Sequence, residues 1–324
     1  MKWRIEYNEI ISIENLLSAW SEFVRGKRKK TDVQYFGAYL FEHILQLHDE
    51  LVEGTYRHGG YRHFRVADLK PRDIHKASVR DRVLHHAIYR VLYPFFDHTF
   101  FADAYSCRIG KGTHRAMDRL RSFAYRVSQN HTRTCWMLKC DIRKFFASVD
   151  HGILLKILAK RISDETTFRL LREVIESFST APGKGLPLGN LTSQLFCNIY
   201  LNELDQFAKH ELKARHYLRY GDDFVLLSEN RAWLEALIPR IRDFLRSELA
   251  LELHPQKVSI NTFASGVDFL GWVHFCDHRI LRRATQRRMV RRIQESPTEA
   301  TLASYRGLLS HGNARKLEYI FLSE

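Results

Sequence analysis

The chain has 324 residues, of which 45% are hydrophobic, and it carries a formal net charge of +14 at pH 7. This length and composition allow a large buried core divided over more than one subdomain, and they exclude a disordered chain. The charge predicts a polyanionic partner, with nucleic acid the leading candidate and an anionic membrane surface the alternative. No apolar run approaches the ~18–20 residues that span a bilayer, and no secretory leader is recognisable, so we expect a cytoplasmic protein.

Two amphipathic helices are expected at the start of the chain. Apolar residues recur at helical spacing over residues 10–24 and again over residues 35–51. The basic run KRKK, residues 27–30, lies between them. We interpret this run as a contact to RNA or DNA phosphates, the alternative being a solvated loop.

Strands and a further helix are predicted next. Aromatic and β-branched residues alternate over residues 56–67, and residues 80–91 show one apolar helical face. A GKGT sequence then follows Arg108, but the GxxxxGK[ST] pattern of a Walker loop is absent. Backbone amides and a guanidinium group can still hold a triphosphate without that motif.

Two strands are predicted to bring three aspartates together. The sequence WMLKCD is predicted to form a strand that ends at Asp141, although a lone aspartate after a strand is also a common helix N-cap. The sequence HYLRYGDDFVLLS predicts a β-hairpin whose tight turn carries Asp222 and Asp223. Adjacent carboxylates repel each other, and a bound cation would offset that repulsion. The alternative is a solvated turn, because Gly-Asp-Asp is also an ordinary turn sequence. If both strands belong to one sheet, the three acids can hold two divalent ions ~3.5–4 Å apart, as in nucleotidyl transfer.

A glycine- and proline-rich loop lies between these acids and leads into a helix expected over residues 191–207. The loop reads PGKGLPLGN, and the helix begins with LTSQ. A backbone rich in glycine lets a base pair approach closely.

Five motifs in order resemble those of reverse transcriptases, and the resemblance covers most of the chain. They are KCDIRKFF, GLPLGNLTSQ and YGDD of the palm, the lysine-bearing LHPQK, and VDFLGW of the primer grip. Five ordered motifs are far more specific than an isolated GDD. The resemblance implies an α+β, right-hand polymerase fold with fingers, a palm of antiparallel sheet plus helices, and a short helical thumb. The implied divisions are an N-terminal helical extension (1–55), fingers (56–134), palm (135–265, with part of the fingers inserted at about 151–185), and primer grip with basic thumb (266–324).

The same resemblance implies a catalytic centre. Its metal ligands would be Asp141, Asp222 and Asp223, with the carbonyl of Ile142 as a further ligand. They would hold two Mg²⁺ ions, for which Mn²⁺ is a substitute. Lys257 would donate a proton to the leaving pyrophosphate.

The resemblance also implies contacts to the incoming deoxynucleotide. The residues concerned are Arg72, Arg108, Phe146, Leu188, Gly189 and Gln194. Phe146 matches the position whose ring blocks a ribose 2′-hydroxyl, the alternative being a core aromatic. Around Arg72 the register of the motif slides, so Lys70 or Lys76 can take its place.

Grip and thumb would hold the template–primer duplex. The grip residues are Phe269, Leu270, Gly271 and Trp272. Residues 279–292 carry seven arginines over two segments that we expect to be helical, the alternative being a solvated basic face. The arginines assigned to the duplex are Arg282, Arg283, Arg287, Arg288, Arg291 and Arg292. We expect no room for a maturase, RNase H or endonuclease domain after the grip, and therefore dependence on partners.

The second palm motif narrows the resemblance. Most reverse transcriptases have Gln-Gly and then Ser-Pro there, whereas this chain has Leu188-Gly189 and Ser193-Gln194. This form resembles the reverse transcriptases of diversity-generating retroelements, which copy a template RNA with errors at adenines to rewrite a target gene. An apolar contact discriminates less sharply than a hydrogen bond, so the loss of glutamine is a physical reason for permissiveness. The implied partners are template RNA, the primer and cDNA duplex, dNTPs and a small basic accessory protein, in a bacterial or phage-encoded system without a membrane partner.

Two other interpretations stay open. The chain could belong to another bacterial lineage, such as a retron, a group II intron-derived enzyme or an antiviral defence system, although the Val-Thr-Gly signal of retron thumbs is absent. It could also be a catalytically idle RNA-binding protein that kept the fold. The intact set of three acids argues against this, because an idle copy has no use for three adjacent like charges.

Overall fold

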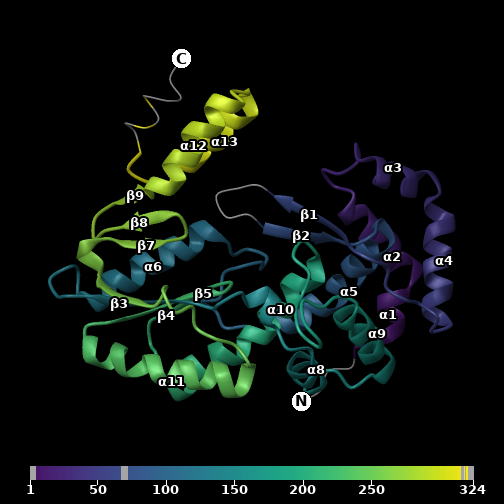
Figure 1. Ribbon diagram of the computed structural model, residues 1–324, viewed down its shortest axis with the longest axis horizontal. Helices are drawn as coiled ribbons and strands as arrows, with labels where there is room; N and C mark the ends of the chain where they lie inside the picture. Colours follow the sequence, from purple (N-terminus) through teal and green to yellow (C-terminus); the bar gives the residue numbers. More distant parts are fainter. Residues whose placement is uncertain (1–4, 67–71, 315–316, 318, 320–324) are drawn as a thin grey trace. The chain divides into compact units, whose positions relative to one another are not determined.

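The computed structural model describes residues 5–66, 72–314, 317 and 319. The chain forms two compact units, each assembled from segments that are distant in sequence (Figure 1). The first unit comprises Met1–Ala102, Arg143–Phe207 and Phe244–Glu252. The second comprises Asp103–Ile142, Ala208–Asp243 and Leu253–Glu324.

The first unit is largely helical. Its helices are α1 (Tyr7–Ile11), α2 (Ile13–Phe23), α3 (Thr31–Ala38), α4 (Leu40–Val52), α5 (Val79–Asp97), α7 (Phe145–Ser148), α8 (His151–Ala159), α9 (Glu165–Glu176) and α10 (Leu191–Gln206). α5 packs against α2 and α10 and buries Val83, Leu84 and Ile88 completely. The helices predicted over residues 80–91 and 191–207 are confirmed. Ser78 caps the first turn of α5, which therefore begins at Val79, and the helix continues beyond its prediction to Asp97.

Both helices predicted near the start are divided in two. Ser12 separates α1 from α2, and its hydroxyl accepts a hydrogen bond from the amide of Asn15 at 3.2 Å. Tyr39, with φ of −116° and ψ of 37°, separates α3 from α4. Periodicity therefore located the apolar faces correctly, but a local cap and a non-helical dihedral pair decided where each helix begins.

A two-stranded antiparallel sheet completes the first unit. It pairs β1 (Arg62–Val66) with β2 (Arg72–Lys76), and Lys70, the alternative to Arg72, lies outside the described residues. The predicted strand character of residues 56–67 is confirmed for β1.

The second unit is built on a four-stranded antiparallel sheet. Its strands are β3 (Trp136–Asp141), β4 (Tyr217–Tyr220), β5 (Asp223–Ser228) and β6 (Ser259–Thr262), in the order β4-β5-β3-β6. The hairpin and the Asp141 strand lie in one sheet, as predicted, because β3 pairs directly with β5. Helix α6 (Thr113–Val127) covers one face, where Leu120 and Phe123 pack with Leu218 and Val225 (Figure 1). In sequence, η1 (Phe207–Glu211) precedes β4, α11 (Arg231–Leu249) lies between β5 and β6, and η2 (Phe263–Ser265) follows β6.

A second sheet and two helices end the described chain. The strands are β7 (Val267–Phe269), β8 (Trp272–His274) and β9 (Arg279–Leu281), followed by α12 (Arg283–Glu295) and α13 (Glu299–Leu309). The expectation of helix from residue 279 onward is wrong for β9, because Leu281 pairs with Trp272 and is buried with it. Within the ranges that the structure describes, no helix is long and apolar enough to cross a membrane.

Candidate active site

Asp141 and Asp223 face each other across two central strands of the second unit. Asp141 ends β3, Asp223 begins β5, and the two residues are direct antiparallel partners. Directly opposite residues project from the same face of a sheet, with Cβ atoms ~4.5–5.5 Å apart. Asp141 is only 7% exposed, so two carboxylates share a largely desolvated position.

The turn that carries Asp222 is held from both sides. Gly221 has a φ of 63°, a backbone conformation that glycine adopts without strain. The Nη1 group of Arg219 donates to the carbonyl of Gly221 at 3.2 Å, and the amide of Ile142 donates to the carbonyl of Asp222 at 3.2 Å. Arg219 is 1% exposed and was not among the residues predicted for this site. Its signal in the sequence is an arginine among the apolar residues of YLRY.

Lys257 lies on the acid pair. Its Nζ donates to Oδ2 of Asp141 at 2.8 Å, and the two side chains are 39% and 11% exposed. The LHPQK segment is aligned along the end of β3, because Leu253 bridges to Ile142 and the amide of His254 donates to the carbonyl of Asp141 at 2.8 Å. Lys257 is therefore brought to the acids by backbone pairing as well as by charge.

The acids perturb each other. Burial, the adjacent carboxylates of Asp141 and Asp222, and a side-chain hydrogen bond with Asp141 raise the pKa of Asp223 to about 6, against the opposing pull of the Lys139 ammonium. The raised pKa shows that the negative charges of Asp141 and Asp223 are not fully balanced by the protein. Carboxylate oxygens are the ligands that hard divalent cations prefer. The donor set thus fits a divalent metal ion. In the described part of the chain, however, no three His, Cys, Asp or Glu side chains already converge as a metal cluster.

Lys139 connects the strand that ends at Asp141 to the predicted primer grip. It lies on β3, and its Nζ donates to the carbonyl of Asp268 on β7 at 2.8 Å. Arg282, one of the arginines assigned to the duplex, forms an ion pair with the Asp268 carboxylate at 3.0 Å. Lys139 was not predicted as part of this site, because a lysine inside a strand gives no signal of a partner 129 residues away.

The predicted grip residues divide into two kinds. The rings of Phe269 and Trp272 are 0% and 1% exposed and lie in two hydrophobic clusters. Leu270 and Gly271 form the turn between β7 and β8, with φ of 51° and 86°. A nucleic acid could therefore reach this turn and its backbone, but not the two aromatic rings.

The residues assigned to the nucleotide lie in both units. Leu188 accepts a hydrogen bond from the amide of His75 on β2 at 3.1 Å, which ties the LPLGN loop to the strand that carries Arg72. Gly189 has a φ of 109°, and an added Cβ would lie 3.0 Å from Ile74.

The other three residues assigned to the nucleotide lie on different elements of the chain. Phe146 is half-buried in α7 and packs edge-on against Phe145 with ring centroids 5.6 Å apart. Gln194 is half-buried in the first turn of α10. Arg108, in the second unit, donates to the carbonyl of Ala104 at 3.1 Å.

The predicted thumb arginines form an exposed row on α12. Arg283, Arg287 and Arg291 recur at every fourth residue and are all exposed, while Met289 on the opposite side is buried. Arg292 is also exposed, and Arg288 is half-buried. This face can present several positive charges to a phosphate backbone.

Residues 41–274 match the family described as reverse transcriptase (RNA-dependent DNA polymerase). The chain is 27% identical over 294 residues to Protein YkfC of Escherichia coli strain K12, covering 78% of this chain and 75% of that protein. It is 20% identical over 321 residues to the Group II intron-encoded protein LtrA of Lactococcus lactis subsp. cremoris, covering 76% of this chain and 51% of LtrA.

Solved telomerase structures share the fold. Telomerase from Candida albicans, in complex with a TWJ fragment of telomeric RNA, matches 71% of this chain and 46% of its own, with a TM-score of 0.53 at 11% identity. Apo telomerase from Candida tropicalis, truncated from the C-terminal domain, matches 75% of this chain and 60% of its own, with a TM-score of 0.51 at 12% identity. This chain thus spans about half of LtrA and less than two thirds of these telomerases.

The predicted α+β, right-hand polymerase fold is confirmed by these neighbours together with the helices and antiparallel sheets described above. Reverse transcriptase domains generally use divalent metal ions, which agrees with the carboxylate pair at the ends of β3 and β5. The matched residues 41–274 make up most of the chain and contain all three aspartates, and the chain therefore belongs to the reverse transcriptase family of RNA-directed DNA polymerases, related to group II intron-encoded proteins.

Proposed function

We propose that this chain adds deoxynucleotides to a primer 3′-hydroxyl on an RNA template, with two Mg²⁺ ions held by Asp141, Asp222 and Asp223. The observation that carries the proposal is the direct pairing of Asp141 with Asp223 beside the turn that bears Asp222. The carbonyl of Ile142 is a further proposed ligand. Two such ions, when bound, activate the attacking hydroxyl and stabilise the leaving oxygen at phosphorus.

The residues of the chain have separate tasks in this mechanism. The aspartates would hold the metals as ionised carboxylates, and the burial of Asp141 limits the access of competing water. Lys257 holds a proton on Nζ and donates it to the leaving pyrophosphate. Its ion pair with Asp141 keeps the ammonium at the centre where that proton is used.

The remaining assignments concern substrate selection. Arg72 and Arg108 bind the triphosphate, and Phe146 excludes a ribose 2′-hydroxyl. Leu188, Gly189 and Gln194 border the new base pair. The grip turn and the α12 arginines hold the duplex. The segment boundaries 1–55, 56–134, 135–265 and 266–324 for extension, fingers, palm and thumb belong to the same proposal.

We further propose that the enzyme serves a diversity-generating retroelement in a bacterial or phage-encoded system. Leu188 and Gln194 support this, because they depart from the glutamine and proline of most relatives. In this role the chain copies a template RNA with errors at adenines, in the cytoplasm, together with a small basic accessory protein. A group II intron-derived role is the second candidate, favoured by the similarity to LtrA.

Primer extension tests the proposal. The full chain is given an RNA template, a DNA primer, dNTPs and Mg²⁺ or Mn²⁺, and the cDNA is sequenced. The matched variants are Asp222→Asn with Asp223→Asn, and, as control, Asp118→Asn with Asp277→Asn, two exposed aspartates of the same unit. Extension lost only in the first variant, with errors concentrated opposite adenines, supports both the enzyme and the lineage. Extension with rare, scattered errors rejects the lineage, and no extension after addition of the cognate RNA and accessory protein rejects the activity.

A further inference from the structure

Helices α3 and α4 carry a surface unlike the rest of this basic chain. Residues 31–56 contain five acidic residues and no lysine or arginine, although the chain has 51 lysines and arginines. Phosphate backbones are attracted by cations and repelled by carboxylates. This surface therefore suits a partner other than the nucleic acid that the remaining charge favours.

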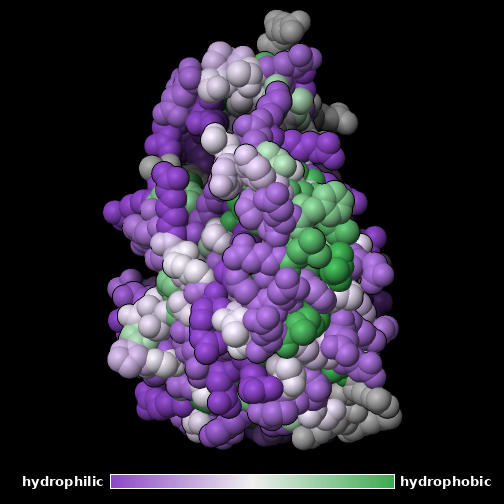
Figure 2. All heavy atoms as spheres, turned by 90° about the vertical axis from the view of Figure 1, so that its right-hand side faces the viewer, coloured by the Kyte–Doolittle hydropathy of each residue, from purple (hydrophilic) through white to green (hydrophobic). Residues whose placement is uncertain are grey.

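α4 has one apolar stripe more than its fold requires. The inner stripe is buried and consists of Ile44, Leu47 and Leu51. The outer stripe is 69%, 46% and 60% exposed at Phe41, Leu45 and Val52. Successive residues advance by ~100° around a helix axis, so the outer three lie within roughly 40° of one another. Figure 2 looks onto the side of the molecule where α3 and α4 lie and shows hydrophobic side chains gathered into a patch.

A row of carboxylates runs beside the outer stripe. Glu42, Asp49 and Glu53 are exposed, and they project about 80° around the axis from the apolar row. In the part of the chain that the structure describes, none of the three forms an ion pair. Their charge is therefore available to a partner.

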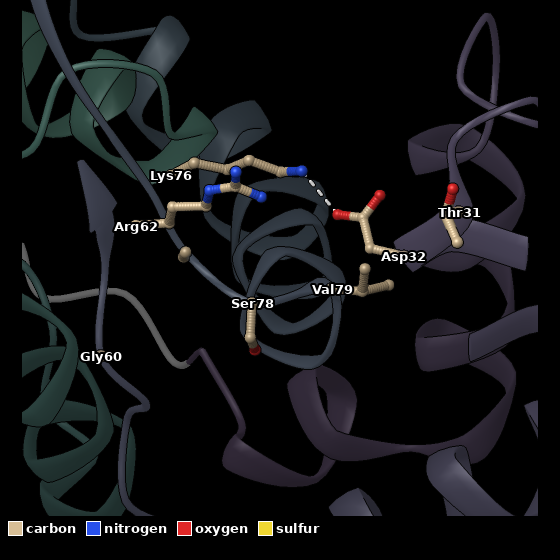
Figure 3. A pocket seen from close by; sticks show the side chains of 8 residues that line it. Thr31, Asp32, Gly60, Arg62, Lys76, Ser78 and Val79 are labelled. Carbon is tan, nitrogen blue, oxygen red and sulfur yellow. Dashed lines mark hydrogen bonds and ion pairs between the residues drawn. The ribbon is translucent and has the colours of Figure 1, made fainter. Parts of the chain in front are cut away.

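The other two acids of this segment are already paired. Glu50 pairs with Arg80. Asp32 pairs with Lys76 at 2.5 Å and with Arg82 at 3.0 Å. Asp32 and Lys76 line a cavity of about 490 Å³, which Figure 3 shows from close by. Among the five acids of residues 31–56, the three of the α4 row are therefore the ones with no ion pair in the described part of the chain.

We propose that α4 is the docking face for a basic protein. The α4 docking face consists of Phe41, Glu42, Leu45, Asp49, Val52 and Glu53. Its partner presents an amphipathic helix whose apolar side chains cover the outer stripe and whose lysines or arginines meet the carboxylate row. Exposed apolar patches rimmed by polar residues mark interaction sites, and here the neighbouring rim residues are carboxylates.

The charges of the chain select this occupant. RNA, DNA and anionic membranes would meet like charge at the carboxylate row. A second copy of the chain offers the basic helix α12, but Met289 of that helix is already buried in its own unit. A separate protein with both an apolar and a cationic face satisfies both rows. The inference concerns α4 alone and does not use the polymerase site.

Fluorescence anisotropy with two designed peptides tests the docking face on the full chain. One labelled helical peptide of ~20 residues has a leucine stripe flanked by lysines, and its twin has glutamate at each lysine. One variant, Phe41→Ser with Leu45→Ser, removes the apolar stripe. A second, Glu42→Gln with Asp49→Asn and Glu53→Gln, removes the charges. The control is Ile109→Ser, whose side chain is 74% exposed in the second unit.

The lysine peptide is expected to bind the wild type and the control equally, and each docking-face variant about tenfold or more weakly. All altered side chains are exposed, so folding, checked by circular dichroism, and primer extension should not change. Equal binding to wild type and variants overturns the proposal. Loss of RNA affinity, of vesicle binding or of self-association in the same variants also overturns it, because the occupant would then be RNA, lipid or a second copy.

Discussion

The ammonium of Lys257 lies 2.8 Å from a carboxylate oxygen of Asp141, although the two residues are 116 positions apart in the sequence. A lysine this close to a carboxylate that is a proposed metal ligand can balance its charge, hold it in place, or pass on a proton. These roles respond differently to substitution.

Replacing Lys257 by methionine is expected to lower the rate of nucleotide addition by ~10²-fold, because the leaving pyrophosphate would lose its proposed proton donor. Arginine keeps the charge at this place but cannot release its proton, so Lys257→Arg should also be slow. Single-turnover extension over a pH range measures both. Lys160→Met, which removes an exposed lysine paired with Glu203, is the matched control. Full activity in Lys257→Arg would show that charge alone is needed there.

Phe146→Ala is expected to admit ribonucleotides. Removing the ring opens space for a 2′-hydroxyl, so discrimination against rNTPs should fall by roughly tenfold or more, while dNTP addition changes less. Competition between dCTP and CTP on one template measures the ratio of kcat/KM values. Phe168→Ala, another half-buried phenylalanine of the first unit, is the control. An unchanged ratio would make Phe146 a packing residue.

Leu188→Gln is expected to raise fidelity opposite template adenines. Glutamine would supply a hydrogen-bonding group at a position that we propose borders the new base pair, and hydrogen bonds reject a wrong partner more sharply than apolar contacts do. Sequencing of cDNA from one template gives the error rate at all four bases. Errors opposite the other three bases serve as the internal control. The idea fails if the adenine errors persist at the wild-type level.

Replacing Arg283, Arg287 and Arg291 by glutamine is expected to weaken duplex binding at low salt. Each phosphate contact that is lost also flattens the dependence of log K on log [salt], so the slope should fall by roughly 2–3. Titrations of a primer–template duplex at several salt concentrations measure this slope. The control replaces three exposed arginines on α11 by glutamine and has the same net charge as the α12 variant. These are Arg240, Arg242 and Arg246. Equal slopes for the two variants would mean that α12 contributes only general charge.

Substitution of alanine for two glycines near the end of the described chain is expected to change the free energy of unfolding in opposite directions. A Cβ at Gly312 would lie 2.1 Å from the ring of Trp272, so Gly312→Ala should lower the free energy of unfolding by about 1–3 kcal/mol. Gly307 lies inside α13 with nothing within 4 Å of its Cβ position, and Gly307→Ala should raise stability by up to ~1 kcal/mol through helix propensity. Urea unfolding compares them. Similar values for both would contradict the close packing on Trp272.

The sequence by itself determined the elements that local patterns encode. The strand that ends at Asp141 and the hairpin around Asp222 lie where predicted, because apolar runs and a Gly-Asp-Asp turn are short-range signals. The ordered motifs also predicted the family that the comparisons establish.

Only the tertiary structure decided which side chains meet. Local sequence patterns do not predict the ion pair of Lys257 with Asp141 or the hydrogen bond of Lys139 to Asp268, because the partners are far apart in the sequence. They do not predict the burial of Arg219 behind the turn either. Burial likewise withdrew Phe269 and Trp272 from the surface. The physical reason is that propensity and periodicity act over a few residues, whereas charge pairing and burial depend on segments that folding brings together from distant parts of the chain.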